Sequence, residues 1–193
     1  MSHGASAASP WLLRWAHLIP TGGKVLDVAA GSGRHARWLA AHGFAVTAID
    51  RDAAAMQSLA DCAHTIVTDI EGGPWPLDGA TFDLVLVTNY LYRPLFPSLV
   101  AAVGAAGVLI YETFAAGNES VGRPARPEFL LAPGELLGAV PGLRIVAYED
   151  GFLDDPQRFV QRLAAVRELP GAAPVRHPLV GPGDEAGSLE STG

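Results

Sequence analysis

The chain has 193 residues, 49% of them hydrophobic, which suits a single domain with a sizeable core. Acidic residues outnumber basic ones by 20 to 13, and the net charge of −7 makes duplex nucleic acid and anionic membranes unfavourable partners. A local basic patch is still possible, because five of the arginines in the second half of the chain can supply one: Arg123, Arg126, Arg158, Arg162 and Arg167.

Cys62 is the only cysteine, which excludes an internal disulfide and a cysteine-based metal cluster. We expect no metal, and we interpret Cys62 as a buried small side chain rather than a nucleophile. No run of 18 apolar residues is present, and the N-terminus lacks the basic start and apolar stretch of a signal peptide. We therefore expect a cytoplasmic protein that does not enter a membrane.

Apolar periodicity predicts alternating helices and strands. Ser9 and Pro10 provide a cap and first turn for the first helix, and Asp52 provides a cap for the third. In chain order we predict a helix at 10–19, a strand at 24–28, a helix at 34–42, strands at 44–49, 64–67 and 82–87 with a helix at 52–60 among them, a helix at 95–103, a strand at 107–114, a helix at 134–140, and strands at 143–148 and 159–166.

This alternation predicts an α/β fold, a Rossmann-like doubly wound sheet with helices on both faces and mostly parallel strands. The last two strands follow each other without an intervening helix, so we expect them to pair antiparallel. We place a single domain at residues 1–169. Residues 170–193 are rich in proline, glycine and small residues, and we expect a flexible C-terminal tail there.

A glycine-bearing turn follows the first strand. Asp27 lies near the end of that strand, and the sequence continues Val28-Ala29-Ala30-Gly31-Ser32-Gly33 into a helix. In a doubly wound sheet the carboxyl ends of the strands face the ligand crevice. Glycine there permits positive φ and a close approach of the backbone to a ligand. A tight turn without a ligand is the alternative.

Residues 31–36 formally satisfy the dinucleotide pattern G-x-G-x-x-G/A, which alone is a weak signal. A dinucleotide would aim its pyrophosphate at the helix N-terminus. S-adenosylmethionine has no phosphate and carries an ammonium, a carboxylate and a sulfonium. A carboxylate at Asp27 would repel a pyrophosphate but can anchor the ammonium, so Asp27 favours S-adenosylmethionine.

Two further acids follow the next two strands. Asp50 can accept hydrogen bonds from both ribose hydroxyls, although it can also act only as a cap for the following helix. Arg51 can flank the adenine with its aliphatic stem. Asp69 can accept from the adenine amine while Ile70 packs on the ring, although a surface turn is an alternative for this pair. Acids at the ends of three successive strands form a more specific signal than any one of them.

These motifs resemble those of class I S-adenosylmethionine-dependent methyltransferases. Residues 25–33 are similar to the family's first motif, 46–50 to its second, 68–70 to its third, and 82–87 to the strand before the methyl-transfer site. The resemblance implies a seven-stranded sheet with the last strand antiparallel, and cofactor contacts from Asp27, Ala29, Gly31, Gly33, Asp50, Arg51, Asp69, Ile70 and Asn89. The compact size is similar to tellurite-resistance-like small-molecule methyltransferases.

One position departs from the family pattern. Ala29 stands where the first glycine of the motif usually lies. Its methyl group is tolerated if φ is negative, and otherwise it narrows the approach to the methionine part of the cofactor.

The methyl acceptor is expected after the fourth strand. Tyr92 and Arg93 are our candidates for substrate contact, and Tyr90 can shape the pocket. Glu112, late in the fifth strand, can act as a base or bind an amine. Methyl transfer from a sulfonium mainly requires alignment, so no base is demanded.

A polar loop from Glu112 to Pro127 is predicted to form a mobile lid, in which Arg123 and Arg126 are solvated charges or bind an anionic substrate. His35, at the start of the second helix, is interpreted as a helix-surface residue.

The sequence thus predicts methyl transfer to a small-molecule nucleophile at oxygen, nitrogen, sulfur or a related chalcogen. The alternatives are an RNA or protein methyltransferase, a catalytically inactive binding or scaffold protein, and an NAD-linked oxidoreductase. Asp27 and the two closing strands disfavour the oxidoreductase. The oligomeric state and the acceptor atom stay open.

Overall fold

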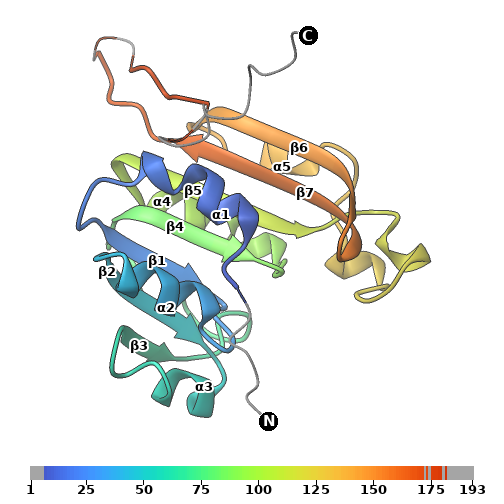
Figure 1. Ribbon diagram of the computed structural model, residues 1–193, viewed down its shortest axis with the longest axis horizontal. Helices are drawn as coiled ribbons and strands as arrows, with labels where there is room; N and C mark the ends of the chain where they lie inside the picture. The colour runs from blue at the N-terminus through green and yellow to red at the C-terminus, as the bar shows by residue number, and fades with distance from the viewer. Residues whose placement is uncertain (1–6, 172, 174, 180, 182–193) are drawn as a thin grey trace, which may run out of the picture.

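The computed structural model describes residues 7–171, 173, 175–179 and 181 (Figure 1). Its strands are β1 (Lys24–Val28), β2 (Ala45–Asp50), β3 (His64–Val67), β4 (Phe82–Thr88), β5 (Val103–Phe114), β6 (Arg144–Asp154) and β7 (Gln157–Val166). Its α-helices are α1 (Pro10–Trp15), α2 (Arg34–Ala41), α3 (Ala53–Gln57), α4 (Phe96–Ala102) and α5 (Glu135–Ala139). Short 3₁₀ helices occupy Ala16–Leu18, Arg93–Leu95, Asn118–Ser120 and Pro127–Phe129.

The strands form one seven-stranded sheet in the order β3-β2-β1-β4-β5-β7-β6. β1 pairs in parallel with β2 and β4, and β3 and β5 extend the parallel part on either side. β7 pairs antiparallel with both β5 and β6. The predicted fold and the antiparallel last strand are therefore confirmed. The reversed β7 departs from the strand order 3-2-1-4-5-6 of dinucleotide-binding sheets.

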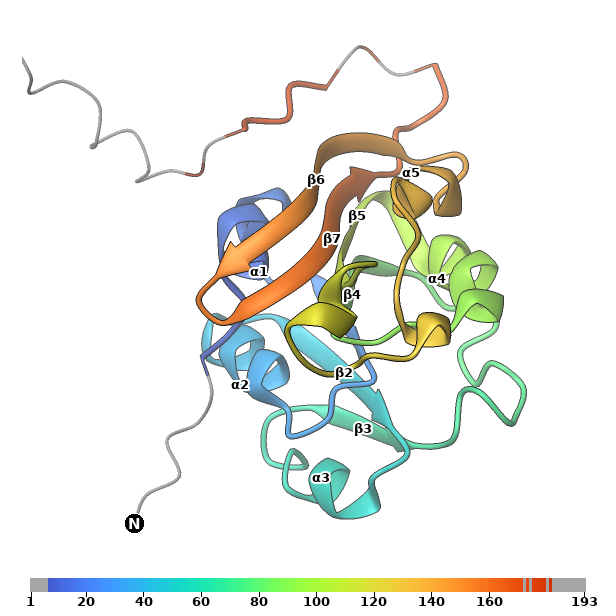
Figure 2. The ribbon, with the colours of Figure 1, turned by 90° about the vertical axis from the view of Figure 1, so that its right-hand side faces the viewer.

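Helices cover both faces of the sheet (Figure 2). On one face α1 and α2 bury Trp11, Trp15 and Leu39 against the sheet. On the other face α4 buries Phe96 and Leu99. Both faces of the central strands are apolar because both are covered, which explains the continuous hydrophobic runs of β1 and β4.

Two predicted caps are confirmed, although the elements differ in length. The Ser9 hydroxyl accepts from the Trp11 N–H, and the Asp52 carboxylate accepts from the N–H groups of Ala54 and Ala55. The predicted helix at 10–19 changes to a 3₁₀ turn at Ala16, and the helix expected at 52–60 ends at Gln57.

The closing hairpin is longer than predicted. β6 and β7 pair from Arg144↔Val166 to Asp154↔Gln157, so both strands continue through polar positions near the turn. β6 lies at the edge of the sheet, and its side chains are mostly partly or fully exposed. A polar strand end is stable there because backbone pairing, not burial, holds it. The predicted domain reaches Val166 in this sheet. Most of the predicted tail lies outside the described residues, and that prediction remains untested.

No helix among the described residues is long and apolar enough to cross a membrane.

Candidate active site

The parallel strands end at one edge of the sheet, and a cavity of about 560 Å³ opens there. Figure 2 looks onto this edge, and the segment between β5 and α5 crosses in front of it. Its wall contains most of the predicted cofactor residues: Ala29, Gly31, Asp50, Arg51, Asp69, Ile70 and Asn89. Residues widely separated in sequence therefore meet at one crevice, as the doubly wound topology requires.

Gly31 and Gly33 serve different purposes in the turn. Gly31 has φ +54°, and a Cβ there would meet nothing within 4 Å, so glycine is needed for backbone conformation and leaves the cavity open. Gly33 has φ +76°, and a Cβ there would lie 2.3 Å from the Leu59 side chain. Gly33 therefore allows the turn to pack on Leu59, and it does not line the cavity.

Ala29 adopts the left-handed region with φ +54°. The prediction that Ala29 accommodates its methyl group through a negative φ is therefore wrong. The residue keeps the backbone path that glycine would favour and accepts the strain of an L-residue there. Ala29 also lines the cavity, so its methyl group contributes to the wall.

Asp27 lies beneath the glycine turn and is 1% exposed. Its neighbours across the sheet are Ala48 and Leu86, which belong to the core under α1 and α2. Neither carboxylate oxygen has a hydrogen-bond partner in the described structure. Burial raises the pKa of Asp27 from its ordinary value of 3.8 to about 7, although the nearby Ala36 backbone N–H, which does not reach hydrogen-bond geometry, and the Arg34 charge act in the opposite direction.

The unpartnered Asp27 carboxyl is the strongest local indication of a cationic ligand. A buried polar group without a partner is costly, and native structures leave few of them. Asp27 does not itself form the cavity wall, so an ammonium group would reach it through the glycine turn. Its chemistry fits the ammonium of S-adenosylmethionine and does not fit a pyrophosphate.

Asp50 shapes the turn as well as the cavity. Its Oδ2 accepts from the Gly31 N–H at 2.8 Å, and its Oδ1 accepts from the Asp52 N–H at 2.9 Å. Each carboxylate oxygen has capacity for another hydrogen bond, so both can still accept from a vicinal diol. The helix cap itself is Asp52, not Asp50. The alternative that Asp50 only caps α3 is therefore wrong.

Asp69 and Ile70 lie at the far end of the same cavity. Asp69 Oδ1 accepts from the Glu71 N–H at 2.9 Å, which stabilises the turn after β3. Ile70 is 8% exposed and belongs to the hydrophobic core while lining the cavity. An acceptor beside an apolar surface is the environment that an adenine ring requires.

The candidates for substrate contact are distributed differently from the prediction. Arg93 pairs with Glu135 and donates to the carbonyl oxygens of Glu128 and Leu130, so it fastens the 127–130 turn to α5. Tyr92 donates to the Glu71 carbonyl oxygen at 3.1 Å. Neither residue lines a cavity at this edge among those found in the described structure.

Tyr90 lines the cofactor cavity and the small apolar cavity beside it. Its hydroxyl is buried and has no partner among the described residues. Burial, followed by the nearby Glu71 carboxylate, raises the pKa of Tyr90 far above its ordinary value. Tyr90 is therefore a neutral hydroxyl at physiological pH and can donate a hydrogen bond.

Glu112 is fully buried and is held by three groups. Its Oε1 accepts from Ser9 at 3.1 Å and from Arg158 at 3.3 Å, and its Oε2 accepts from Arg162 at 3.3 Å. Both of its carboxylate oxygens are therefore occupied by protein donors. The structure therefore speaks against a base or amine-binding role for Glu112 and makes it the anchor of these arginines.

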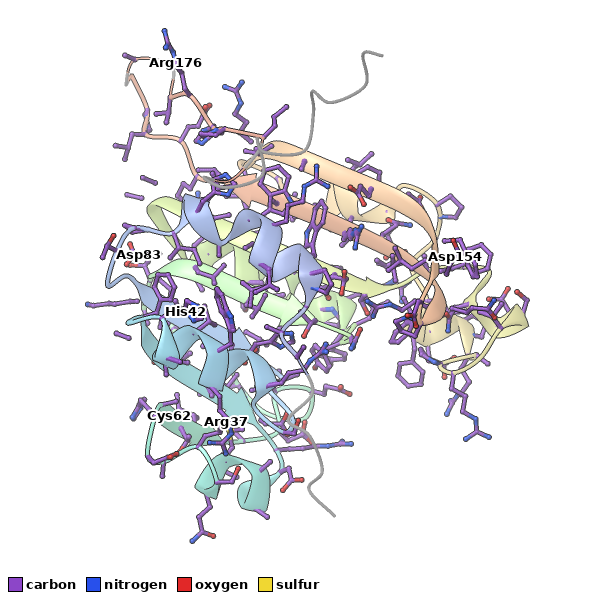
Figure 3. All side chains as sticks on the ribbon, viewed as in Figure 1. Arg37, His42, Cys62, Asp83, Asp154 and Arg176 are labelled. Carbon is purple, nitrogen blue, oxygen red and sulfur yellow. The ribbon has the colours of Figure 1, made fainter. Side chains whose placement is uncertain are left out.

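The remaining interpretations are partly corrected. His35 is 2% exposed rather than on the helix surface, its Nδ1 lies 3.3 Å from Thr88 Oγ1, and burial lowers its pKa to about 4. Cys62 is partly buried and lines a cavity with Lys24 and His64, the first residues of β1 and β3, and it is labelled at the lower left of Figure 3. Arg126 pairs with Glu128 and lies outside the cavities, whereas Arg123 lines one of them.

Arg158 lies at this site, although the sequence assigned it no specific role. It stands near the start of β7 and donates to Asn89 Oδ1 at 3.1 Å. Asn89 has φ +55° and lines the cofactor cavity and both smaller cavities beside it. In the sequence, Arg158 was noted only as one of five arginines that can form a local basic patch. Among the described residues, no three His, Cys, Asp or Glu side chains come together in a metal-binding group.

Comparison with known proteins gives a family match for part of the chain. Residues 25–105 match the family described as the methyltransferase domain. No curated protein matches the chain significantly in sequence.

Similar solved structures include TehB from Haemophilus influenzae, with a TM-score of 0.71 and 18% identity, covering 86% of this chain and 64% of that chain. A TehB-like S-adenosylmethionine-dependent methyltransferase from Corynebacterium glutamicum has a TM-score of 0.59 and 20% identity, covering 79% of this chain and 84% of its own. The glycopeptide N-methyltransferase MtfA, complexed with S-adenosylhomocysteine, has a TM-score of 0.57 and 18% identity, covering 77% and 84%. The sequence match and the strand order agree: residues 25–105 match a methyltransferase domain, and the sheet has the strand order of the class I methyltransferase fold.

Proposed function

We propose that the protein transfers the methyl group of S-adenosylmethionine to a small-molecule nucleophile. The observation that carries this proposal is the junction at Asn89, where the cofactor cavity meets two smaller cavities. These cavities measure about 530 Å³ and 230 Å³. One compartment for a cofactor and adjoining compartments for an acceptor are the arrangement that a two-substrate transfer needs.

Three parts of the cofactor are assigned to three places in the site. Asp27 receives the ammonium, Asp50 the ribose hydroxyls, and Asp69 with Ile70 the adenine. Each has an observation in support: the orphaned carboxyl of Asp27, the free acceptor capacity of Asp50, and the polar and apolar pair after β3.

On the acceptor side, S-adenosylmethionine supplies an activated methyl group with its leaving group in place. The protein needs only to hold the nucleophile in line with that methyl group. The neutral Tyr90 hydroxyl can orient the nucleophile by donating a hydrogen bond. Because Glu112 is paired with two arginines, a proton released by the acceptor passes to solvent or to the acceptor's own basic group.

The size and charge of the protein support a small acceptor. A net charge of −7 disfavours RNA, and the acceptor compartments are bounded cavities of a few hundred Å³. The TehB-like structures among the similar proteins agree with a compact methyltransferase of this kind.

Isothermal titration calorimetry with S-adenosylhomocysteine, S-adenosylmethionine and NAD tests the cofactor assignment. We expect both sulfur nucleosides to bind and NAD not to bind. Asp50→Ala is expected to weaken binding by about 1–3 kcal/mol, because hydrogen bonds to a charged group are lost. Asp61→Ala, at a carboxylate outside the cavity, is the matched control.

The methyl transfer itself is tested by S-adenosylhomocysteine release with a panel of oxygen, nitrogen and sulfur nucleophiles. Turnover of at least one small acceptor is expected. NAD binding without a response to S-adenosylhomocysteine would contradict the proposal. Cofactor binding with no turnover on the panel would instead support the catalytically inactive scaffold.

A further inference from the structure

The larger of the two acceptor cavities has an unusual electrostatic character. Among the described residues, three arginines line it (Arg34, Arg123 and Arg158), and no acidic side chain does. Acidic residues outnumber basic ones in the whole chain by 20 to 13, so this local excess of positive charge runs against the composition. A cavity lined by one sign of charge concentrates ligands of the opposite sign.

Arg158 is fixed in this wall rather than free to swing into solvent. Its side chain is 13% exposed, one terminal nitrogen donates to Asn89 Oδ1, and the other donates to Glu112 Oε1. Its Nε is buried without a hydrogen-bond partner among the described residues. A guanidinium has five N–H groups, so donors remain for a ligand.

The surrounding charges leave Arg158 incompletely neutralised. Glu112 is shared between Arg158 and Arg162, and Arg162 also pairs with Glu149, which in turn pairs with Arg14. Two carboxylates thus face three guanidinium groups in this network. Arg158 is the arginine at the cavity end, so an anionic group bound there would complete its pairing.

The smaller cavity has a different lining. Leu91, Pro124 and Phe129 contribute apolar surface to it, and it shares Phe114 and Asn89 with the arginine-lined cavity. Its one acidic side chain among the described residues, Glu71, also lines the cofactor cavity, so the charged end of an anionic ligand belongs at the arginines and not here. A ligand that extends through the shared wall would meet charge at one end and apolar side chains at the other, with Asn89 and the cofactor cavity between them.

We infer that the methyl acceptor is an organic anion, with its anionic group at Arg158 and Arg123 and an apolar body in the cavity of Leu91 and Phe129. The inference rests on the proposed methyl transfer and specifies the acceptor. Glu112 and Arg162 are positioning residues, since they hold Arg158 and do not line the cavity. An inorganic oxyanion would use the arginines but leave the apolar cavity unused.

Calorimetry with acid and amide pairs of equal shape separates charge from shape. The probes are benzoate and benzamide, 3-phenylpropanoate and 3-phenylpropanamide, and indole-3-acetate and indole-3-acetamide, each titrated into protein saturated with S-adenosylhomocysteine. Sodium sulfate is the inorganic probe. We expect at least one carboxylate to bind about tenfold or more tightly than its amide and than sulfate.

Variants assign the preference to particular arginines. Arg158→Gln and, separately, Arg123→Gln are expected to reduce the preference for acid over amide to about twofold or less, whereas Arg158→Lys keeps part of it. Arg144→Gln is the matched control, because Arg144 is an exposed, paired arginine at the start of β6. If Arg158→Gln does not fold, Arg123→Gln still decides the question.

The outcomes separate this inference from the proposed function. If S-adenosylhomocysteine binds but no carboxylate exceeds its amide, the acceptor is not an organic anion and the methyl-transfer proposal stands. If sulfate binds as tightly as every carboxylate, the arginine-lined cavity is a site for inorganic oxyanions and the inference is overturned. An acid preference that survives both glutamine variants would also overturn the inference. Failure of S-adenosylhomocysteine to bind the wild-type protein would remove the proposed function itself.

Discussion

Asp27 provides a test that requires no knowledge of the acceptor. In the unfolded chain its carboxyl titrates near 3.8, whereas burial raises its pKa in the folded protein to about 7. Between these values the folded state holds a proton that the unfolded state has released, so stability falls as pH rises. The full loss is about 4 kcal/mol, at about 1.4 kcal/mol for each tenfold change in proton affinity.

Asp27→Asn removes this titration while keeping the shape of the side chain. We expect the variant to match the wild type near pH 4 and to become progressively more stable relative to it up to pH 7, by about 2–4 kcal/mol. Above pH 7 the difference should remain constant. His35, whose pKa is lowered to about 4, titrates in both proteins and cancels in the comparison.

The assay is urea unfolding of the ligand-free protein at several pH values between 5 and 8.5, with extrapolation to water. Asp61→Asn, at a mostly exposed carboxylate paired with Arg37, is the control and should show no pH-dependent difference from the wild type. Equal stability of wild type and Asp27→Asn at pH 5 and pH 8 would refute the argument that a buried, unpaired carboxyl is the cause.

Cofactor binding should lower the raised pKa of Asp27. An ammonium beside Asp27 favours the charged carboxylate and lowers its pKa, so binding at pH 6, where Asp27 is about 90% protonated, should release close to one proton. Calorimetry of S-adenosylhomocysteine binding in buffers of different ionisation enthalpy measures that number. Release is expected to vanish at pH 8.5 and in Asp27→Asn. Proton release that is unchanged in Asp27→Asn would show that another group titrates on binding.

Three further predictions concern stability and are checked by the same unfolding measurement. Ala29→Gly should stabilise the protein by about 1 kcal/mol, because it relieves the left-handed φ of +54°; a loss would show that the turn is unstrained. Gly33→Ala should destabilise it by more than about 1 kcal/mol, because its Cβ would overlap Leu59. Glu112→Ala should cost about 3–5 kcal/mol, since it leaves buried guanidinium groups without their carboxylate; a change under about 1 kcal/mol would contradict that pairing.

The cofactor side could be predicted because its signals are local in sequence. Asp27 and Asp50 lie at or next to the last residue of a strand, Gly31 and Asp69 follow a strand closely, and parallel strands end at one edge. Topology alone therefore brings their backbones together. The sequence pattern could not predict that Gly31 and Gly33 have different roles in the turn. Gly33 is needed because the Leu59 side chain packs against it, and Leu59 is distant in the sequence.

The acceptor side depends on contacts that only the folded chain creates. Tyr92 and Arg93 lie in the segment after β4, which made them candidates, but Arg93 pairs with Glu135 on α5 and does not line the cofactor cavity. Antiparallel β7 has the opposite effect on Arg158. Because β7 runs against β5, its first residues, not its last, reach the edge where the parallel strands end. A search for functional residues after the ends of strands therefore misses Arg158. The antiparallel direction of β7 places Arg158 beside Asn89.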